Sequence, residues 1–149
     1  MPSQWEKIDA HGMQIALEEA QKSYEEGGIP IGSSILVPDA SEAAGYRVLG
    51  SGHNERVQKS SATLHGEISA VENAGRLRAE VYRAATIIPR VVIGENKTFM
   101  GGESLLIENG VEVIVKDRQD CKDLMEKFII EKPQDWNEDI GELDTRLGM

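Results

Sequence analysis

Short apolar runs alternate with segments of helical periodicity along most of this chain, and this alternation is the feature that most limits its fold. The first helical segment has apolar residues spaced so that they fall largely on one face, namely Ile8, Met13, Ala16, Leu17, Ala20 and Tyr24. Two runs rich in β-forming residues follow at 31–37 and 46–51. Because the turn residues Pro38 and Asp39 come directly after the first run, the pair is predicted to form a hairpin.

Predicted helices and strands alternate in the rest of the sequence. A near-helical run beginning at Leu64 follows the hairpin, and Gly75 is its expected C-terminal cap. The later segments are predicted as a strand at 90–94, a helix at 103–109, a strand at 111–115 and a helix at 120–132. Asp135 and Glu138 then resemble a capping pair for a last helix. This order predicts an α/β sandwich with a mixed sheet, and we expect one domain over residues 1–149.

The charge balance restricts the ligands that the chain can bind. Sixteen Lys and Arg against 26 Asp and Glu give a formal net charge of -10, which repels phosphate backbones and anionic lipids. The sequence shows no signal-peptide pattern and no apolar run of membrane-spanning length. We therefore expect a cytoplasmic protein, with the nucleus left open as a second compartment, that binds a small molecule and neither nucleic acid nor membrane.

The segment His65-Gly66-Glu67, at the start of the predicted second helix, carries the clearest chemistry. A histidine and a glutamate held on a rigid helix start can supply a metal ligand and a proton carrier to one reacting atom. The same residues can equally be a hydrogen-bonded histidine and a carboxylate stabilised by the helix dipole. Three residues alone do not separate these interpretations.

Five longer stretches give more specific information, at 25–32, 52–54, 61–69, 88–96 and 133–142. With them the whole chain resembles the fungal, yeast-type cytosine deaminases of the cytidine deaminase superfamily. The resemblance implies a three-layer cytidine-deaminase-like sandwich with a mixed central sheet. It also implies a homodimer, although the helix missing from this chain belongs to the family's dimer interface, which argues against the dimer here.

The sequence departs from the family pattern at one place. Family members have a strand and a helix between the residues that match 81–82 and 88–90, with Pro-Cys-x-x-Cys at their junction, whereas this chain has only 83–87 there. The sandwich is therefore expected to be reduced by about one strand-helix unit, on the order of twenty residues. We expect the strand at 90–94 to move into the vacant central position and to pair in parallel with 31–37.

The resemblance assigns the metal and the proton transfer to the second helix. It implies that His65 binds zinc and that Glu67 carries protons from the zinc-bound water to the base and to the departing ammonia. The two thiolates that complete such a site are absent, since Cys121 is the only cysteine. His53, Glu95 and Cys121 are possible substitutes, but none has the spacing of a ligand set. We therefore expect zinc to bind weakly or not at all.

The resemblance also implies a binding site for the base. Asn54 is expected to hydrogen-bond the cytosine carbonyl and ring edge, Gly66 to donate its backbone N–H, and Asp139 to accept from the exocyclic amine. The apolar walls of the pocket are expected from Ile31, Phe99 and Trp136. Taken singly, Asn54 is equally a turn residue, and the three apolar residues are equally core residues.

Two functional interpretations follow. The first is a zinc-dependent hydrolase that converts cytosine to uracil and ammonia in pyrimidine salvage, although the absent thiolates argue against turnover by this chain. The second is a catalytically inactive relative, whether a splice product, a faulty gene model or a decayed paralogue, that acts at most in binding or interaction. The cysteine content favours the second on chemical grounds, and the length of the matching stretches favours the family in either case.

Overall fold

The computed structural model describes residues 1–81, 90–98 and 101–141 of the chain. Its elements are, in order, α1 (Gln4–Glu25), β1 (Gly32–Pro38), β2 (Tyr46–His53), α2 (Gly66–Ala74), β3 (Arg90–Ile93), α4 (Glu103–Glu108), β4 (Glu112–Val115), α5 (Gln119–Glu131) and α6 (Pro133–Asp139). Each helix and strand predicted from the sequence is present, with small shifts at the ends. The α/β class is thereby confirmed.

Helix α1 begins at a capping box that we did not predict. The Ser3 hydroxyl accepts from the backbone N–H of Glu6 at 3.2 Å, and the Glu6 carboxylate accepts from the backbone N–H of Ser3 at 2.5 Å. These bonds satisfy N–H groups that have no partner within the helix. The residues that α1 buries include Ile8, Met13 and Ala20, which confirms the apolar face expected from the sequence.

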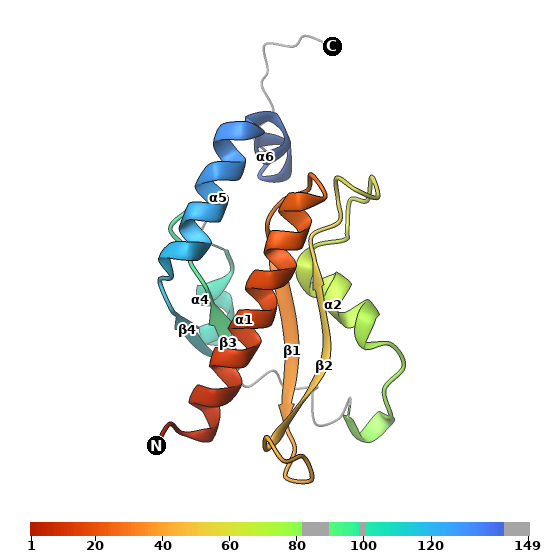
Figure 1. The fold of residues 1–149 in the computed structure, drawn as a ribbon, viewed down its shortest axis with the longest axis vertical. Coiled ribbons are helices and arrows are strands. Elements are labelled where there is room, and N and C mark those ends of the chain that lie inside the picture. Colours follow the sequence, from red (N-terminus) through yellow and green to blue (C-terminus); the bar gives the residue numbers. More distant parts are fainter. Residues whose placement is uncertain (82–89, 99–100, 142–149) are drawn as a thin grey trace.

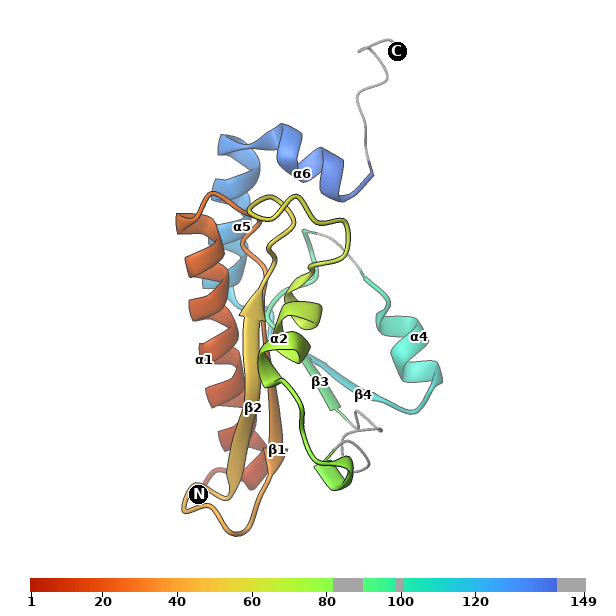
Figure 2. The ribbon, with the colours of Figure 1, turned by 90° about the vertical axis from the view of Figure 1, so that its right-hand side faces the viewer.

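The β1–β2 hairpin lies between two helices, with α1 on one face and α2 on the other (Figure 2). Glycines make this close packing possible. A Cβ on Gly32 would lie 2.0 Å from the carbonyl oxygen of Ala16 in α1, and one on Gly50 would lie 2.5 Å from that of Ala70 in α2. Because no side chain fits at either position, the helices rest directly on the hairpin backbone.

Strands β3 and β4 form a second, parallel sheet, with α4 between them along the chain, and α5 runs beside α1 (Figure 1). Among the described residues the two sheets share no ladder, since one contains only β1 and β2 and the other only β3 and β4. The predicted parallel pairing of 90–94 with 31–37 is therefore wrong. The sandwich is reduced as expected, but β3 does not occupy the position beside β1.

An ionic cluster explains where β3 lies. Arg90, the first residue of β3, donates to both carboxylate oxygens of Asp9 in α1, at 3.1 and 2.7 Å, and to Glu112 at 2.5 Å. Lys116 Nζ lies 3.7 Å from the same Asp9 carboxylate. A carboxylate as buried as that of Asp9, whose side chain is 3% exposed, requires such partners. The cluster therefore anchors β3 on α1 rather than on the edge of β1.

The core cluster lies near the C-terminal helices and consists of Ile29, Met125, Phe128 and Trp136. Helix α6 begins at Pro133, which occupies its first turn, and not at an Asp135 cap as we predicted. The fixed φ angle of proline suits a first helical position, so Asp135 lies inside the first turn instead. In the part of the chain that the structure describes, no helix has the length and apolar character needed to cross a membrane.

Candidate functional site

A cavity of about 450 Å³ lies between the start of β1 and the end of β3. Helices α1, α5 and α6 close its other sides. The lining is mostly apolar, and its polar members include His65, Glu95, Thr98, Cys121 and Asp139. The cavity thus occupies the space between the two unconnected sheets, and it is large enough for a small organic ligand.

The structure brings several of the predicted site residues to this cavity. Ile31, His65, Trp136 and Asp139, which come from three distant segments of the sequence, all line it. Trp136 and Ile31 are also part of or packed against the core cluster, so they have the structural role that we weighed as an alternative. Trp136 and Ile31 can belong to the core and line the cavity at the same time, because the core cluster forms one wall of the cavity.

The two residues that follow His65 are placed differently. Gly66 is buried against β1, and a Cβ there would lie 3.2 Å from the Ile31 carbonyl oxygen. Glu67 is exposed and is not among the residues that line the cavity. Phe99 lies outside the described residues.

Asn54 is completely buried, and all but one of its polar groups are engaged. Its backbone N–H donates to the Ile31 carbonyl at 2.8 Å, and its own carbonyl lies 2.9 Å from Ser23 Oγ and 3.2 Å from Gln58 Nε2. Its side-chain Oδ1 accepts from the backbone N–H of Arg56 at 3.1 Å. Within the described residues Nδ2 has no partner. A buried donor of this kind costs stability unless a ligand accepts from it.

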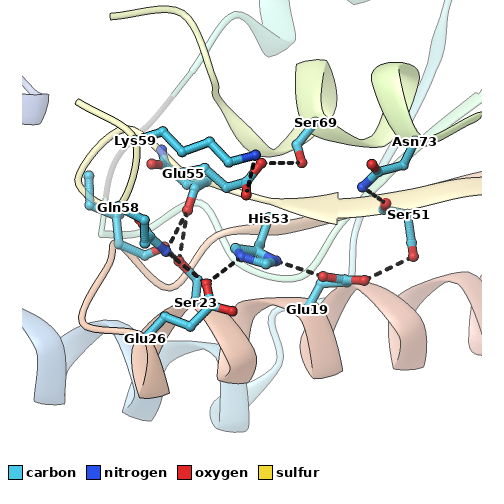
Figure 3. Close-up of polar contacts among 12 residues, drawn as sticks. Glu19, Ser23, Glu26, Ser51, His53, Glu55, Gln58, Lys59, Ser69 and Asn73 are labelled. Atoms are coloured by element: carbon cyan, nitrogen blue, oxygen red, sulfur yellow. Dashed lines mark hydrogen bonds and ion pairs between the residues drawn. The ribbon is translucent and has the colours of Figure 1, made fainter. Parts of the chain in front are cut away.

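A network of polar side chains holds the end of β2, from which Asn54 follows (Figure 3). His53 lies between two carboxylates of the α1 region, with Nδ1 2.7 Å from Glu19 and Nε2 2.9 Å from Glu26. Burial alone would raise the pKa of Glu19, but hydrogen bonds from His53 and Ser51 outweigh it, so that this pKa lies below its ordinary value. The network fixes the backbone beside Asn54.

Asp139, the last residue of α6, forms an ion pair with Arg56. The pair joins the loop after β2 to the C-terminal helix, and the side chains are 22% exposed for Arg56 and 9% for Asp139. Sequence analysis did not identify Arg56 as a site residue. Its position two residues after Asn54 was the available signal, but an arginine in a polar loop is usually a solvated surface residue.

The side chains near His65 do not fit a tetrahedral zinc site, which needs deprotonated sulfur or imidazole donors close together. Among the described residues no three His, Cys, Asp or Glu side chains are grouped so that they could hold a metal ion. Burial raises the pKa of the Cys121 thiol to about 11, which keeps it protonated. Both ring nitrogens of His53 face carboxylates, and Glu95 accepts from the backbone of Lys97 and Thr98.

Comparison with known proteins places the chain in a family. Residues 6–92 match the family model of the cytidine and deoxycytidylate deaminase zinc-binding region. The cytosine deaminase of Candida albicans is 55% identical over 152 residues, which cover 90% of this chain and 97% of that protein. The 152 aligned positions outnumber the 149 residues of this chain, so the relative has residues where this chain has none.

Two further proteins are more distantly similar. A tRNA-specific adenosine deaminase of Streptococcus pyogenes is 39% identical over 62 residues, or 42% of this chain and 35% of that protein. A solved structure from a study of A-to-I editing by tRNA:A34 deaminases at the wobble position of transfer RNA has a TM-score of 0.50 and 23% identity, covering 71% of this chain and 97% of that chain. That structure shares the fold. From the matched family model and the Candida relative, we conclude that the chain belongs to the cytosine deaminases of the cytidine and deoxycytidylate deaminase family.

Proposed function

We propose that this chain binds cytosine in the cavity between β1 and β3 and that it lacks the metal-holding half of the deaminase site. The observation that carries this proposal is the buried Nδ2 of Asn54, which has no partner within the described residues. Asn54 is bonded to Ile31, and Ile31 lines the same cavity as Asp139. Asn54 is not itself among the residues that line the cavity, whereas Asp139 is; a donor beside the cavity and an acceptor in its lining suit a base that presents a carbonyl and an amine.

Each recognition group has a part in this proposal. Asn54 donates to the carbonyl of the base, Asp139 accepts from the exocyclic amine, and the backbone N–H of Gly66 donates to the ring edge. Ile31 and Trp136 supply apolar surface against which a planar ring packs. The formal charge of -10 favours a free base over a polynucleotide, although the Streptococcus relative is named as a tRNA deaminase.

A second candidate function is zinc-dependent hydrolysis of cytosine to uracil and ammonia in pyrimidine salvage. One observation favours it, because His65 lines the cavity in which the base is proposed to bind. Bound zinc would supply an activated water at neutral pH. Against this candidate stand the protonated thiol of Cys121 and the engaged nitrogens of His53, which leave His65 without the donors that a tight site requires.

Three measurements on the purified chain distinguish these candidates. Equilibrium dialysis measures cytosine binding, elemental analysis measures zinc per chain, and an ammonia assay measures turnover. The binding proposal expects saturable cytosine binding with little zinc and no ammonia. One zinc per chain together with ammonia release would establish the second candidate and contradict the incomplete metal site.

A variant and its control make the binding measurement specific. Asn54→Asp replaces the unpartnered donor by an acceptor and is expected to abolish saturable binding of cytosine. Asn109→Asp makes the same chemical change at the exposed residue that caps the C-terminus of α4 and is expected to bind cytosine like the unaltered chain. If the unaltered chain does not bind cytosine, or if Asn54→Asp binds as well as it does, the proposal is wrong.

A further inference from the structure

Arg56 contacts both proposed recognition side chains, one through its backbone and the other through its guanidinium. Its backbone N–H donates to Asn54 Oδ1 at 3.1 Å. An amide side chain presents a carbonyl oxygen on one side and an NH₂ on the other, so this bond decides which of the two is left for a ligand. The oxygen is used, and the NH₂ of Asn54 remains as a donor.

The guanidinium of Arg56 likewise engages one oxygen of Asp139 and leaves the other for a ligand. Its Nη1 donates to Asp139 Oδ1, and within the described residues Asp139 Oδ2 accepts no hydrogen bond. The carboxylate is 9% exposed, so the arginine supplies a charged donor to it in a site with little water. Because Asp139 lines the cavity, we take its remaining oxygen as the acceptor offered to a ligand there.

The guanidinium is itself held in a confined position. Arg56 Nε is buried and has no hydrogen-bond partner among the described residues, and the side chain as a whole is 22% exposed. In an ordinary surface arginine, this N–H would be exposed and would donate to water. The Arg56 side chain instead points toward α6, where it forms the ion pair with Asp139 that joins segments 83 residues apart in the chain.

From these contacts we infer that Arg56 is a positioning residue that selects cytosine over uracil by fixing Asp139 as an acceptor while Asn54 is left as a donor. The inference rests on the proposed binding of cytosine. Cytosine offers a carbonyl to Asn54 and an amine to Asp139, whereas uracil carries a second carbonyl in place of that amine. A carbonyl facing a carboxylate leaves two acceptors without a proton between them, and such a pairing is unfavourable.

The test measures cytosine and uracil binding by competition dialysis on the full chain and two variants of Arg56. Arg56→Gln removes the charge and is expected to weaken cytosine binding by about 10-fold to 100-fold, the range for a hydrogen bond to a charged group. Uracil binding should change much less, so the ratio of the two affinities falls. Arg56→Lys keeps the charge without the planar fork and is expected to recover part of the ratio.

A neighbouring lysine provides the matched control. Lys59 is 57% exposed, lies in the same loop and pairs with Glu55 rather than with Asp139, so Lys59→Gln removes one positive charge from the loop without touching the site. It is expected to leave both affinities unchanged. Circular dichroism and thermal melting of each variant show whether it is folded.

The outcomes separate this inference from the proposed function. If Arg56→Gln keeps the ratio of the unaltered chain, or loses both bases equally, Arg56 is not a selecting residue and cytosine binding still stands. If Arg56→Gln does not fold, Asp139→Asn makes the same test by removing the charge that Arg56 fixes, and an unchanged ratio there overturns the inference. If the unaltered chain binds neither base, the proposed function and this inference are both wrong.

Discussion

Replacing Arg90 by methionine is expected to remove a large part of the chain's stability, because Arg90 neutralises a carboxylate that water hardly reaches. Its guanidinium donates to both oxygens of Asp9, at 3.1 and 2.7 Å, and the Asp9 side chain is 3% exposed. Hydrogen bonds to Asp9 and then to Glu112 raise the pKa of Arg90, so its guanidinium is charged at any ordinary pH. Methionine would fill much of the same space without the charge.

The magnitude follows from what the substitution leaves behind. Removing one partner of a buried pair costs about 3–5 kcal/mol, because the other charge remains buried. Lys116, at 3.7 Å from Asp9, stays in place, so we expect the lower end, about 3 kcal/mol. Domains of this size have only about 5–15 kcal/mol in total. The loss should therefore be large, since no ladder joins the sheet of β3 to that of β1 among the described residues.

Urea unfolding followed by circular dichroism measures this change in the free energy of unfolding. The double variant Arg90→Met with Asp9→Leu is expected to be more stable than Arg90→Met alone, because it removes the stranded carboxylate as well. Arg118→Met is the control, since Arg118 pairs with Asp120 while 32% exposed, and such a pair is worth about 0–1 kcal/mol. A loss for Arg90→Met no greater than that of the control would refute the reasoning.

Three more predictions follow from other parts of the structure. Because burial raises the pKa of Cys121 from 9.0 to about 11, its thiolate fraction at pH 8 is roughly a hundredfold below that of an ordinary thiol; iodoacetamide labelling followed by mass spectrometry should be correspondingly slow, and labelling at the rate of a free thiol contradicts this. The folded pKa of Glu19 lies below its ordinary 4.5, so the stability that its bonds to His53 contribute is complete above that pH and is lost as the pH falls through the folded pKa. In acid unfolding, Glu19→Gln should therefore start from a lower free energy of unfolding, and that free energy should fall less steeply below pH 4.5. Parallel curves of stability against pH for the variant and the unaltered chain would exclude this role. Gly32→Ala should lower the thermal midpoint strongly, because the new methyl would lie 2.0 Å from the Ala16 carbonyl oxygen; an unchanged midpoint would show that α1 does not rest on this strand.

The sequence alone determined the order and the type of the described elements. Periodicity and turn residues predicted the α1 segment, the β1–β2 hairpin and the later alternation, because these patterns depend on residues close together in the chain. The stretches that carry the family resemblance lie in the same segments, and the Candida relative confirms the family. Local chemistry also misled us once, since Asp135 looked like a helix cap whereas Pro133 begins α6.

Only the tertiary structure decided how the elements are assembled. We expected β3 to join β1, but the buried carboxylate of Asp9 needed a cation, and Arg90 at the start of β3 supplies it from a position 81 residues away. Nothing in the local pattern around Arg90 indicates that partner. The cavity between the sheets is a consequence of this placement.

For the candidate site, too, the sequence identified some features and only the tertiary structure showed the others. Residue types and motifs identified His65, Asn54, Asp139 and Trp136 as candidates, because their chemistry is a property of the side chains themselves. Only the fold showed that Glu67 is exposed and away from the cavity lining, and that Arg56 holds Asp139. Ion pairs and burial depend on segments that meet only after folding, so spacing along the chain does not reveal them.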